Sequence, residues 1–388
     1  MVWELLLKIL FWGTVLGLVH TFFLYPISLK LWTLFRGETR SNEATSLPSV
    51  ALIIAAYNEE DVIAEKIENS LQLDYPSDLL DIIVFSDESN DRTDEIVVGY
   101  EEQGVSLIRI EGRVGKTECQ NRVASKSDAD LLVFSDANSI YESDAITELA
   151  QGFSSNVGCV VGELRYRDSS AVQGESFYWK YESWIKRLES RVHSPVSGNG
   201  SIYAVKSESY VPQPTAAISD FTEPLSIIQN GEFVKYAPDA VAWEETSDST
   251  ATELQRRIRI VTRSWNSIAS FPELLNPFRD LQFAYQLWSH KILRWLSPIL
   301  LIIVFITNIG LAATVDSIMY QLLLGGQFLF YLLAAIGWLT DRFDIESPLA
   351  IHVPYYFLQA NYGMFLGLMN FLRGRNIVVW ETADRSGE

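Results

Sequence analysis

Four long segments of the chain carry no charged side chain. No Asp, Glu, Lys or Arg occurs in residues 9–29, 295–315, 317–340 or 347–372. About 20 apolar residues span the ~30 Å hydrocarbon core of a bilayer, so each segment is long enough for a transmembrane helix. The pattern predicts an integral membrane protein with helices near both ends of the chain.

The region between the first two apolar segments has a different pattern. Short β-rich runs alternate there with helical stretches such as 59–72, and the runs are 50–56, 81–86, 105–110 and 131–135. Strands and helices in alternation predict an α/β fold with a mostly parallel sheet.

These patterns predict four parts, which are an N-terminal transmembrane helix (1–35), an α/β domain (36–275), an interfacial amphipathic helix (276–295) and a C-terminal membrane region (296–388). The third part mixes aromatic and aliphatic side chains with charges, which is typical of a helix lying in the lipid interface. The last charge-free segment contains prolines and asparagines, which favours a re-entrant or interfacial element over another full span.

Basic residues lie on the domain side of the first two spans, namely Lys30, Arg36, Arg40, Arg279, Lys291 and Arg294. The positive-inside rule therefore places the α/β domain in the cytoplasm, at the plasma membrane. A fourth crossing would leave Arg373 and Arg375 outside, so we expect three full spans.

Composition argues against a nucleic-acid-binding protein and against a protein stabilised by disulfides or zinc. The net charge of −19 argues against a nucleic-acid surface, because phosphate binding needs clustered basic residues. Cys119 and Cys159 have no partner at a disulfide or metal-ligand spacing, so both are expected to be ordinary buried residues. Nothing in the sequence indicates an oligomeric state.

Polar residues follow three of the predicted strands, at 57–59, 86–91 and 136–138. Ligands of such sheets bind beyond the carboxyl ends of the strands, so these three tips predict a cation-assisted phosphate site. Asp and Asn also favour turns and helix N-caps, and for Asp91 with Thr93 this alternative stays open.

Five motifs resemble, in order, those of the inverting family 2 glycosyltransferases, which include cellulose and hyaluronan synthases. They read VALIIAAYNEE, FSDESNDRT, GRVGKTECQN, VFSDANSIY and ISDFTEPLSI, and the likeness extends over about residues 48–270. The resemblance implies a GT-A-type nucleotide-sugar-binding domain and transfer of a sugar with inversion.

By this resemblance the first three motifs bind the donor. Tyr57, Asn58 and Glu59 would border the base and ribose of the nucleotide, and Asp87 would contact the same part. Lys116 would approach the diphosphate, where a cation is physically sensible.

The fourth motif resembles the metal-binding DxD signature, with an amide in place of the second carboxylate. Asp136 and Asn138 would hold Mg²⁺ or Mn²⁺ together with diphosphate oxygens, since Mg²⁺ commonly takes only one or two protein ligands beside a phosphate substrate.

The sugar pocket and the base follow from one further segment and from the fifth motif. In SGNGSIYAVKSE, Gly198, Asn199 and Gly200 resemble the pocket floor, where glycine lets the backbone approach the sugar. In ISDFTEPLSI, Ser219 and Asp220 align with the acceptor-activating motif, and Asp220 would be the general base.

The segment LQRRIRIVTRSW resembles the QxxRW motif, with Ile260 where processive synthases carry Trp. Arg259 would contact the diphosphate, while Arg256 and Arg263 would line the acceptor pocket. For these two arginines a solvated helix face or snorkelling at the membrane is the alternative.

We therefore expect a non-processive enzyme that moves a sugar from a nucleotide-sugar, most simply a UDP-sugar, to a lipid-linked or membrane-proximal saccharide acceptor. A processive polysaccharide synthase that extrudes its product is one alternative. An inactive nucleotide-sugar-binding scaffold is another, because fold does not prove function.

Overall fold

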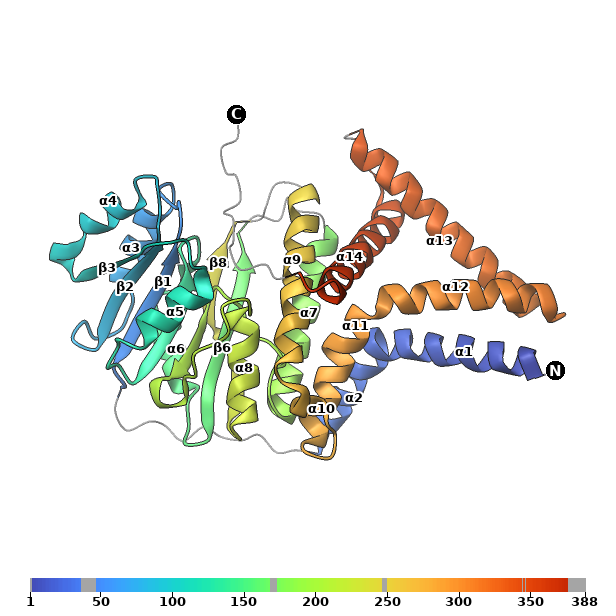
Figure 1. Ribbon diagram of the computed structural model, residues 1–388, viewed down its shortest axis with the longest axis horizontal. Coiled ribbons are helices and arrows are strands. Elements are labelled where there is room, and N and C mark those ends of the chain that lie inside the picture. The colour runs from blue at the N-terminus through green and yellow to red at the C-terminus, as the bar shows by residue number, and fades with distance from the viewer. Residues whose placement is uncertain are drawn as a thin grey trace. The chain divides into compact units, whose positions relative to one another are not determined.

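The structure is a computed structural model that describes residues 2–35, 47–167, 173–245, 250–343, 345 and 347–375. The chain divides into two compact units (Figure 1). The α/β unit comprises Trp32–Asp248 and Arg263–Ala284, and the helical unit comprises Met1–Leu31, Ser249–Thr262 and Tyr285–Arg375. Helix α9 (Thr250–Ala269) contributes residues to both.

One mixed sheet forms the centre of the α/β unit. In the described residues its order is β3-β2-β1-β4-β7-β6-β8-β5. The strands are β1 Val50–Ala56, β2 Leu80–Asp87, β3 Val105–Ile110, β4 Leu131–Asp136, β5 Ile140–Tyr141, β6 Val157–Tyr166, β7 Tyr203–Lys206 and β8 Phe233–Glu244.

The first half of this sheet is parallel, as the sequence predicts. Strand β1 pairs in parallel with β2 and β4, and β2 pairs in parallel with β3. All seven residues of β1 are buried, which explains why its sequence is apolar throughout. The second half is mixed, because β7 runs antiparallel to both β4 and β6 while β6 and β8 are parallel.

Helices of the α/β unit pack against the sheet. They are α3 Ile63–Leu71, α4 Thr93–Val98, α5 Lys116–Ala124, α6 Ala145–Gln151, α7 Gln173–Val192 and α8 Ser219–Gln229, with 3₁₀ turns at Glu101–Gln103, Ser207–Ser209 and Pro272–Leu275. The helix expected at 59–72 begins only at Ile63, because the Glu59 carbonyl closes a turn with the amides of Val62 and Ile63. Cys119 and Cys159 are buried free thiols, as expected.

The helical unit contains long apolar helices and shorter helical segments. They are α1 Val2–Val19, a π-turn His20–Leu24, α2 Tyr25–Leu34, α10 Leu281–Leu287, a π-turn Trp288–Ile292, α11 Leu293–Trp295, α12 Ser297–Thr314, α13 Ile318–Arg342 and α14 Leu349–Leu372. Two of these, α2 and α10, contribute residues to both units. Among the described residues, three helical segments are long and apolar enough to cross a membrane, namely Val2–Leu34, Ser297–Thr314 and Ile318–Arg342.

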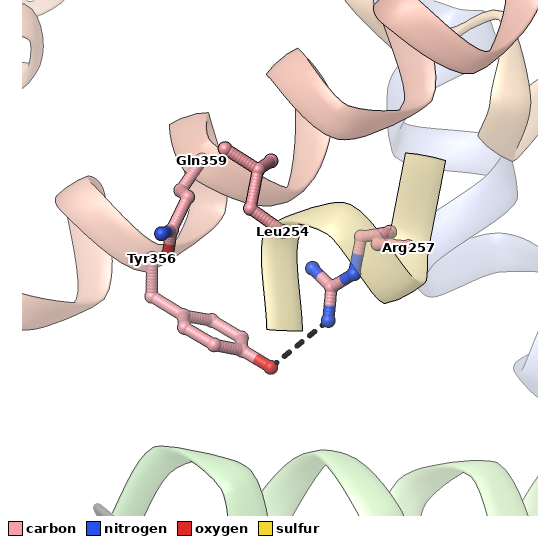
Figure 2. A pocket seen from close by; sticks show the side chains of 4 residues that line it. All are labelled: Leu254, Arg257, Tyr356 and Gln359. Atoms are coloured by element: carbon pink, nitrogen blue, oxygen red, sulfur yellow. Dashed lines mark hydrogen bonds between the residues drawn. The ribbon is translucent and has the colours of Figure 1, made fainter. Parts of the chain in front are cut away.

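The last charge-free segment forms the continuous helix α14, which packs on the first half of α9 within the helical unit. Gly367 allows this close approach, since a Cβ there would lie 2.7 Å from Val261. Nearby, Arg257 donates a hydrogen bond of 3.1 Å to the Tyr356 hydroxyl (Figure 2). With Leu254 and Gln359, these two side chains line a small pocket.

Candidate active site

The loops after β1 and β2 are bound to each other at the carboxyl edge of the sheet. The Asn58 amide donates to the Ser89 hydroxyl at 3.1 Å, and the Asn90 amide donates to Oδ1 of Asn58 at 2.9 Å. Asn58 and Glu88 adopt φ angles of 49° and 59°, the left-handed turns that these contacts require. Two of the predicted strand tips therefore meet, as expected for parallel strands.

Asp91 connects the start of α4 with the loop after β1. Its carboxylate accepts hydrogen bonds from the Thr93 amide at 3.0 Å and the Thr93 hydroxyl at 2.6 Å, at the start of α4. The Glu60 amide donates to its other oxygen at 3.1 Å. The Asp91 carboxylate thus binds the first amide of α4, as the capping interpretation expects, while Arg92 occupies the N-cap position itself. The nearly buried Glu59 donates its own amide to the Thr93 hydroxyl at 2.8 Å.

Asp87 organises the loop that precedes α5. Its fully buried carboxylate accepts hydrogen bonds from Arg113 at 2.8 Å, from the Val114 amide at 2.8 Å and from the Gly115 amide at 3.1 Å. The Arg113 guanidinium in turn lies 3.1 Å above the centre of the Tyr57 ring. Arg113 thus joins two predicted nucleotide-binding residues, although sequence reasoning missed it; its place in the lysine motif was the available signal.

Three charged side chains from separate elements converge on Gly200. Lys116, the first residue of α5, forms an ion pair with Asp136, the last residue of β4. A Cβ placed on Gly200 would lie 3.3 Å from the Lys116 ammonium, 3.5 Å from Oδ2 of Asp136 and 3.8 Å from the Asp220 carboxyl carbon. The absence of a side chain at 200 therefore leaves room among the three charges.

Residues 198–200, which we call the glycine loop, also position the first turn of α8, which carries Asp220. The Gly198 amide donates to the Asp220 carbonyl at 2.7 Å, and a Cβ at 198 would lie at that same distance from this oxygen. The Asn199 side chain donates to the Gly162 carbonyl at 3.2 Å. Gly198 and Asn199, two of the three residues predicted to form the pocket floor, thus hold the loop against α8 and β6.

Burial raises the pKa of the Asp220 carboxyl above its ordinary value. The Asp136 charge acts in the same direction, while the cations Lys116, Arg263 and Lys186 oppose it. A carboxylate with a raised pKa is a stronger base, which suits a group that removes a proton from a hydroxyl.

The arginines of α9 are distributed over both units. Arg263 is buried in the α/β unit and donates to the carbonyls of Ala216 and Ala217, just before α8. It therefore holds the loop that leads to Asp220, a role that sequence reasoning did not predict. Arg256 and Arg259 belong to the helical unit, and their contacts with substrate stay predictions.

The turn after β4 offers oxygen ligands for a divalent ion. Residues 136–139 form a turn closed by the Ser139 amide on the Asp136 carbonyl at 3.2 Å, with Asn138 in its centre. No group of three or more His, Cys, Asp or Glu side chains suited to a metal occurs in the part of the chain described. One carboxylate and one amide still fit a Mg²⁺ or Mn²⁺ ion that takes its remaining ligands from a diphosphate and water.

A buried lysine lies behind this turn. Lys66 donates to the Ser139 carbonyl at 2.5 Å, and its ammonium lies 3.8 Å from the centre of the Tyr141 ring. Burial lowers the pKa of Lys66 to about 7, although Asp136 and Glu244 oppose the shift. Sequence reasoning missed it; the signal was a charge at helical spacing with the apolar residues Ile63 and Ile67 on the buried face of α3.

Comparison with known proteins supports the resemblance. Residues 51–205 match the family model described as Glycosyl transferase family 2. The chain is 26% identical over 233 residues to "Probable glycosyltransferase YdaM" of Bacillus subtilis (strain 168), covering 55% of this chain and 54% of that protein. It is 21% identical over 301 residues to the "Poly-beta-1,6-N-acetyl-D-glucosamine synthase" of Staphylococcus epidermidis, covering 73% and 71%. The chain thus spans about half the length of the first of these relatives.

Among solved structures, the fold is similar to that of the mannosyltransferase PcManGT from Pyrobaculum calidifontis, which was determined in complex with GDP-Man and Mn²⁺. The TM-score is 0.70 at 21% identity, and the alignment covers 96% of this chain and 99% of that one. The likeness confirms the predicted GT-A-type α/β fold.

Proposed function

We propose, from the premise that residues 51–205 form a family 2 glycosyltransferase domain, that this protein transfers a sugar from a nucleotide-sugar to an acceptor hydroxyl with inversion. The observation that carries the proposal is the convergence of Lys116, Asp136 and Asp220 around Gly200. Donor-binding and proton-accepting groups thereby face one small space.

The donor end of the site contains Asp136, Asn138 and Lys116. Asp136 and Asn138 would hold Mg²⁺ or Mn²⁺, which supplies positive charge to the departing diphosphate when bound. Lys116 adds a second cation at the same place. The Mn²⁺ and GDP-Man of the structurally similar mannosyltransferase support this assignment. Tyr57, Asn58, Glu59 and Asp87 would receive the base and ribose, with Arg113 between them.

Asp220 would act as the general base. The acceptor oxygen forms a bond to the anomeric carbon on the face opposite the diphosphate, while the bond from that carbon to the phosphate oxygen breaks. The proton of the acceptor hydroxyl passes to the Asp220 carboxylate, and the nucleoside diphosphate leaves with the bonding electron pair. One base and one cationic site suffice for this single displacement.

The acceptor would be a lipid-linked or membrane-proximal saccharide. This proposal is supported by the three helical segments that are apolar enough to cross a bilayer. The basic residues beside the first two segments support a cytoplasmic position for the α/β unit, where nucleotide-sugars are available.

A second candidate function is polymer synthesis, because several relatives are named as poly-β-1,6-N-acetyl-D-glucosamine synthases. With Arg259 aligned on the Arg of the QxxRW motif, Ile260 stands where processive enzymes carry the Trp that holds the growing polymer, and this favours limited addition. Product length by mass spectrometry separates the two, since a ladder of many sugars would support the synthase.

The test is a screen of purified protein in detergent against nucleotide-sugars, with Mn²⁺ and a lipid extract, monitoring released nucleoside diphosphate. We expect Asp220→Asn to abolish transfer while donor binding persists, and Asp136→Ala to weaken Mn²⁺-dependent donor binding. Asp78→Asn, at an exposed position, is the matched control. Turnover at the wild-type rate in Asp220→Asn would contradict the assignment, and no turnover with any donor would favour the scaffold.

A further inference from the structure

Glu244, the last residue of β8, lies buried between two loops of the site. Its Oε1 atom accepts a hydrogen bond from the Ser139 hydroxyl at 2.6 Å and another from the Ser201 hydroxyl. Ser139 closes the turn that contains Asp136 and Asn138, and Ser201 directly follows Gly200. One carboxylate thus connects the proposed metal turn with the glycine loop.

Lys66 contacts the backbone of the same turn. Its Nζ atom is fully buried and donates to the Ser139 carbonyl, so Lys66 holds the backbone of Ser139 while Glu244 holds its side chain. The Tyr141 hydroxyl adds a hydrogen bond of 3.0 Å to the Ser201 carbonyl. Glu244 therefore joins the turn to the glycine loop, while Lys66 holds the turn and Tyr141 holds the residue after Gly200.

Burying a lysine and a glutamate is not an efficient way to stabilise a fold. Desolvation of two charges offsets much of their attraction, and a well-packed apolar pair is often as stable or more stable. What two buried groups with satisfied hydrogen bonds supply is a fixed geometry. Here that geometry is imposed on two loops that both border the space around Gly200.

We propose that Lys66 and Glu244 are positioning residues that hold the 136–139 turn and the glycine loop at the separation required by a metal-bound nucleoside diphosphate. The inference rests on the proposed function, and it adds to it two residues that would touch neither sugar nor nucleotide. Loss of either would loosen the turn and weaken the Mn²⁺-dependent part of diphosphate binding.

The experiment measures binding of UDP, GDP, ADP, CDP and dTDP to the full chain in detergent by calorimetry, with Mn²⁺ and with EDTA. The quantity compared is the affinity with Mn²⁺ divided by the affinity with EDTA, for the nucleotide that binds best. We expect Lys66→Met and Glu244→Gln to lower this ratio about tenfold. A role in folding alone would lower the unfolding temperature without changing the ratio.

Two matched controls make the same kinds of contact elsewhere. Lys206 also donates to a backbone carbonyl, that of Ser154, at 2.9 Å. Glu163 also accepts from two hydroxyls, those of Ser183 and Tyr236. Lys206→Met and Glu163→Gln should leave the ratio within twofold of wild type, whereas a tenfold fall in the controls would overturn the inference.

Ser139→Ala and Ser201→Ala keep the inference testable if the charge variants do not fold. Each removes one hydroxyl from Glu244, and each should lower the Mn²⁺ dependence in the same direction. Wild-type Mn²⁺ dependence in both serine variants would overturn the positioning role while leaving the proposed function intact. Failure of the wild-type protein to bind any of the five nucleotides would instead overturn the proposed function, and the inference with it.

Discussion

Asp220 is the residue whose chemistry depends most on its surroundings. Because burial raises its pKa, the fraction of Asp220 that is ionised and able to accept a proton falls as the pH drops through that raised value. We predict that kcat declines toward acid with a midpoint above the ordinary Asp pKa. A rate profile measured at saturating donor and acceptor checks this, and a midpoint at or below the ordinary value would contradict it.

The same shift predicts how Asp220→Asn behaves as a protein. A raised folded-state pKa means that the ionised carboxylate destabilises the fold above the ordinary Asp pKa. We therefore expect Asp220→Asn to lose ~10²–10⁴-fold in kcat while unfolding, near neutral pH, at the same temperature as wild type or higher. Thermal unfolding of both proteins at the same pH tests the second half, and a lower midpoint would speak against a buried charge.

Lys66 gives an opposite pH dependence. Its pKa is about 7 in the folded protein against 10.5 for an ordinary lysine, so the unfolded chain binds more protons between these values. The free energy of unfolding should rise with pH in this window, by up to about 1.4 kcal/mol per pH unit. Lys66→Met removes this contribution. The difference between wild type and Lys66→Met, measured by chemical unfolding from pH 7.5 to 9.5, should grow with pH, and a constant difference would refute the shift.

At the scale of elements, the glycine loop packs directly on the first turn of α8. At Gly200 an added methyl group would meet the flexible ammonium of Lys116, so Gly200→Ala should fold while filling the space around the three charges. At Gly198 it would meet the backbone carbonyl of Asp220, which can move only with the helix.

We therefore predict that two alanine substitutions in this loop affect different properties, one the activity and the other the stability. Gly200→Ala should lower kcat/KM at least tenfold with little change in unfolding temperature. Gly198→Ala should destabilise the protein by about 1–3 kcal/mol, as overpacking does. Assays of unfolding and turnover on both variants distinguish these outcomes, and equal stability losses would show that the loop does not have the described geometry.

The parallel strands were predictable because each is a short apolar run followed by polar residues. The runs at 50–56 and 105–110 match β1 and β3 residue for residue, and polar tips mark where β2 and β4 end. The mixed second half was not predictable, since β7 has only four residues and inserts between β4 and β6 from far along the chain. Sequence reasoning missed Lys66 and Arg113 because their partners are non-local contacts.

The turn before α10 is expected to contact lipid. Phe278 is 97% exposed and Leu281 65% exposed, within a segment whose composition predicts an interfacial helix. A polarity-sensitive dye on Phe278→Cys should shift to the blue in lipid nanodiscs and be quenched by lipids labelled near the headgroup. The same dye on Asp78→Cys, an exposed control, should show neither effect. Equal spectra at both sites would rule out the contact.

At the scale of the whole molecule, the number of membrane crossings decides on which side of the membrane the residues after α14 lie. Helix α14 packs on the first half of α9, which carries Arg256, Arg257 and Arg259. Arginines are strongly disfavoured in hydrocarbon, so a helix that packs against Arg257 should lie at the interface. Together with three segments apolar enough to span, this favours an odd number of crossings.

Labelling with a membrane-impermeant maleimide tests this topology, and the buried native thiols Cys119 and Cys159 keep the background low. Asp316→Cys, in the exposed turn between α12 and α13, should react in intact cells. Arg373→Cys, just after α14, should react only in inverted vesicles, together with Asp78→Cys in the α/β unit. If α14 crossed the bilayer, Arg373→Cys would react in intact cells, and the charge bias that places the α/β unit in the cytoplasm would then fail at the last helix.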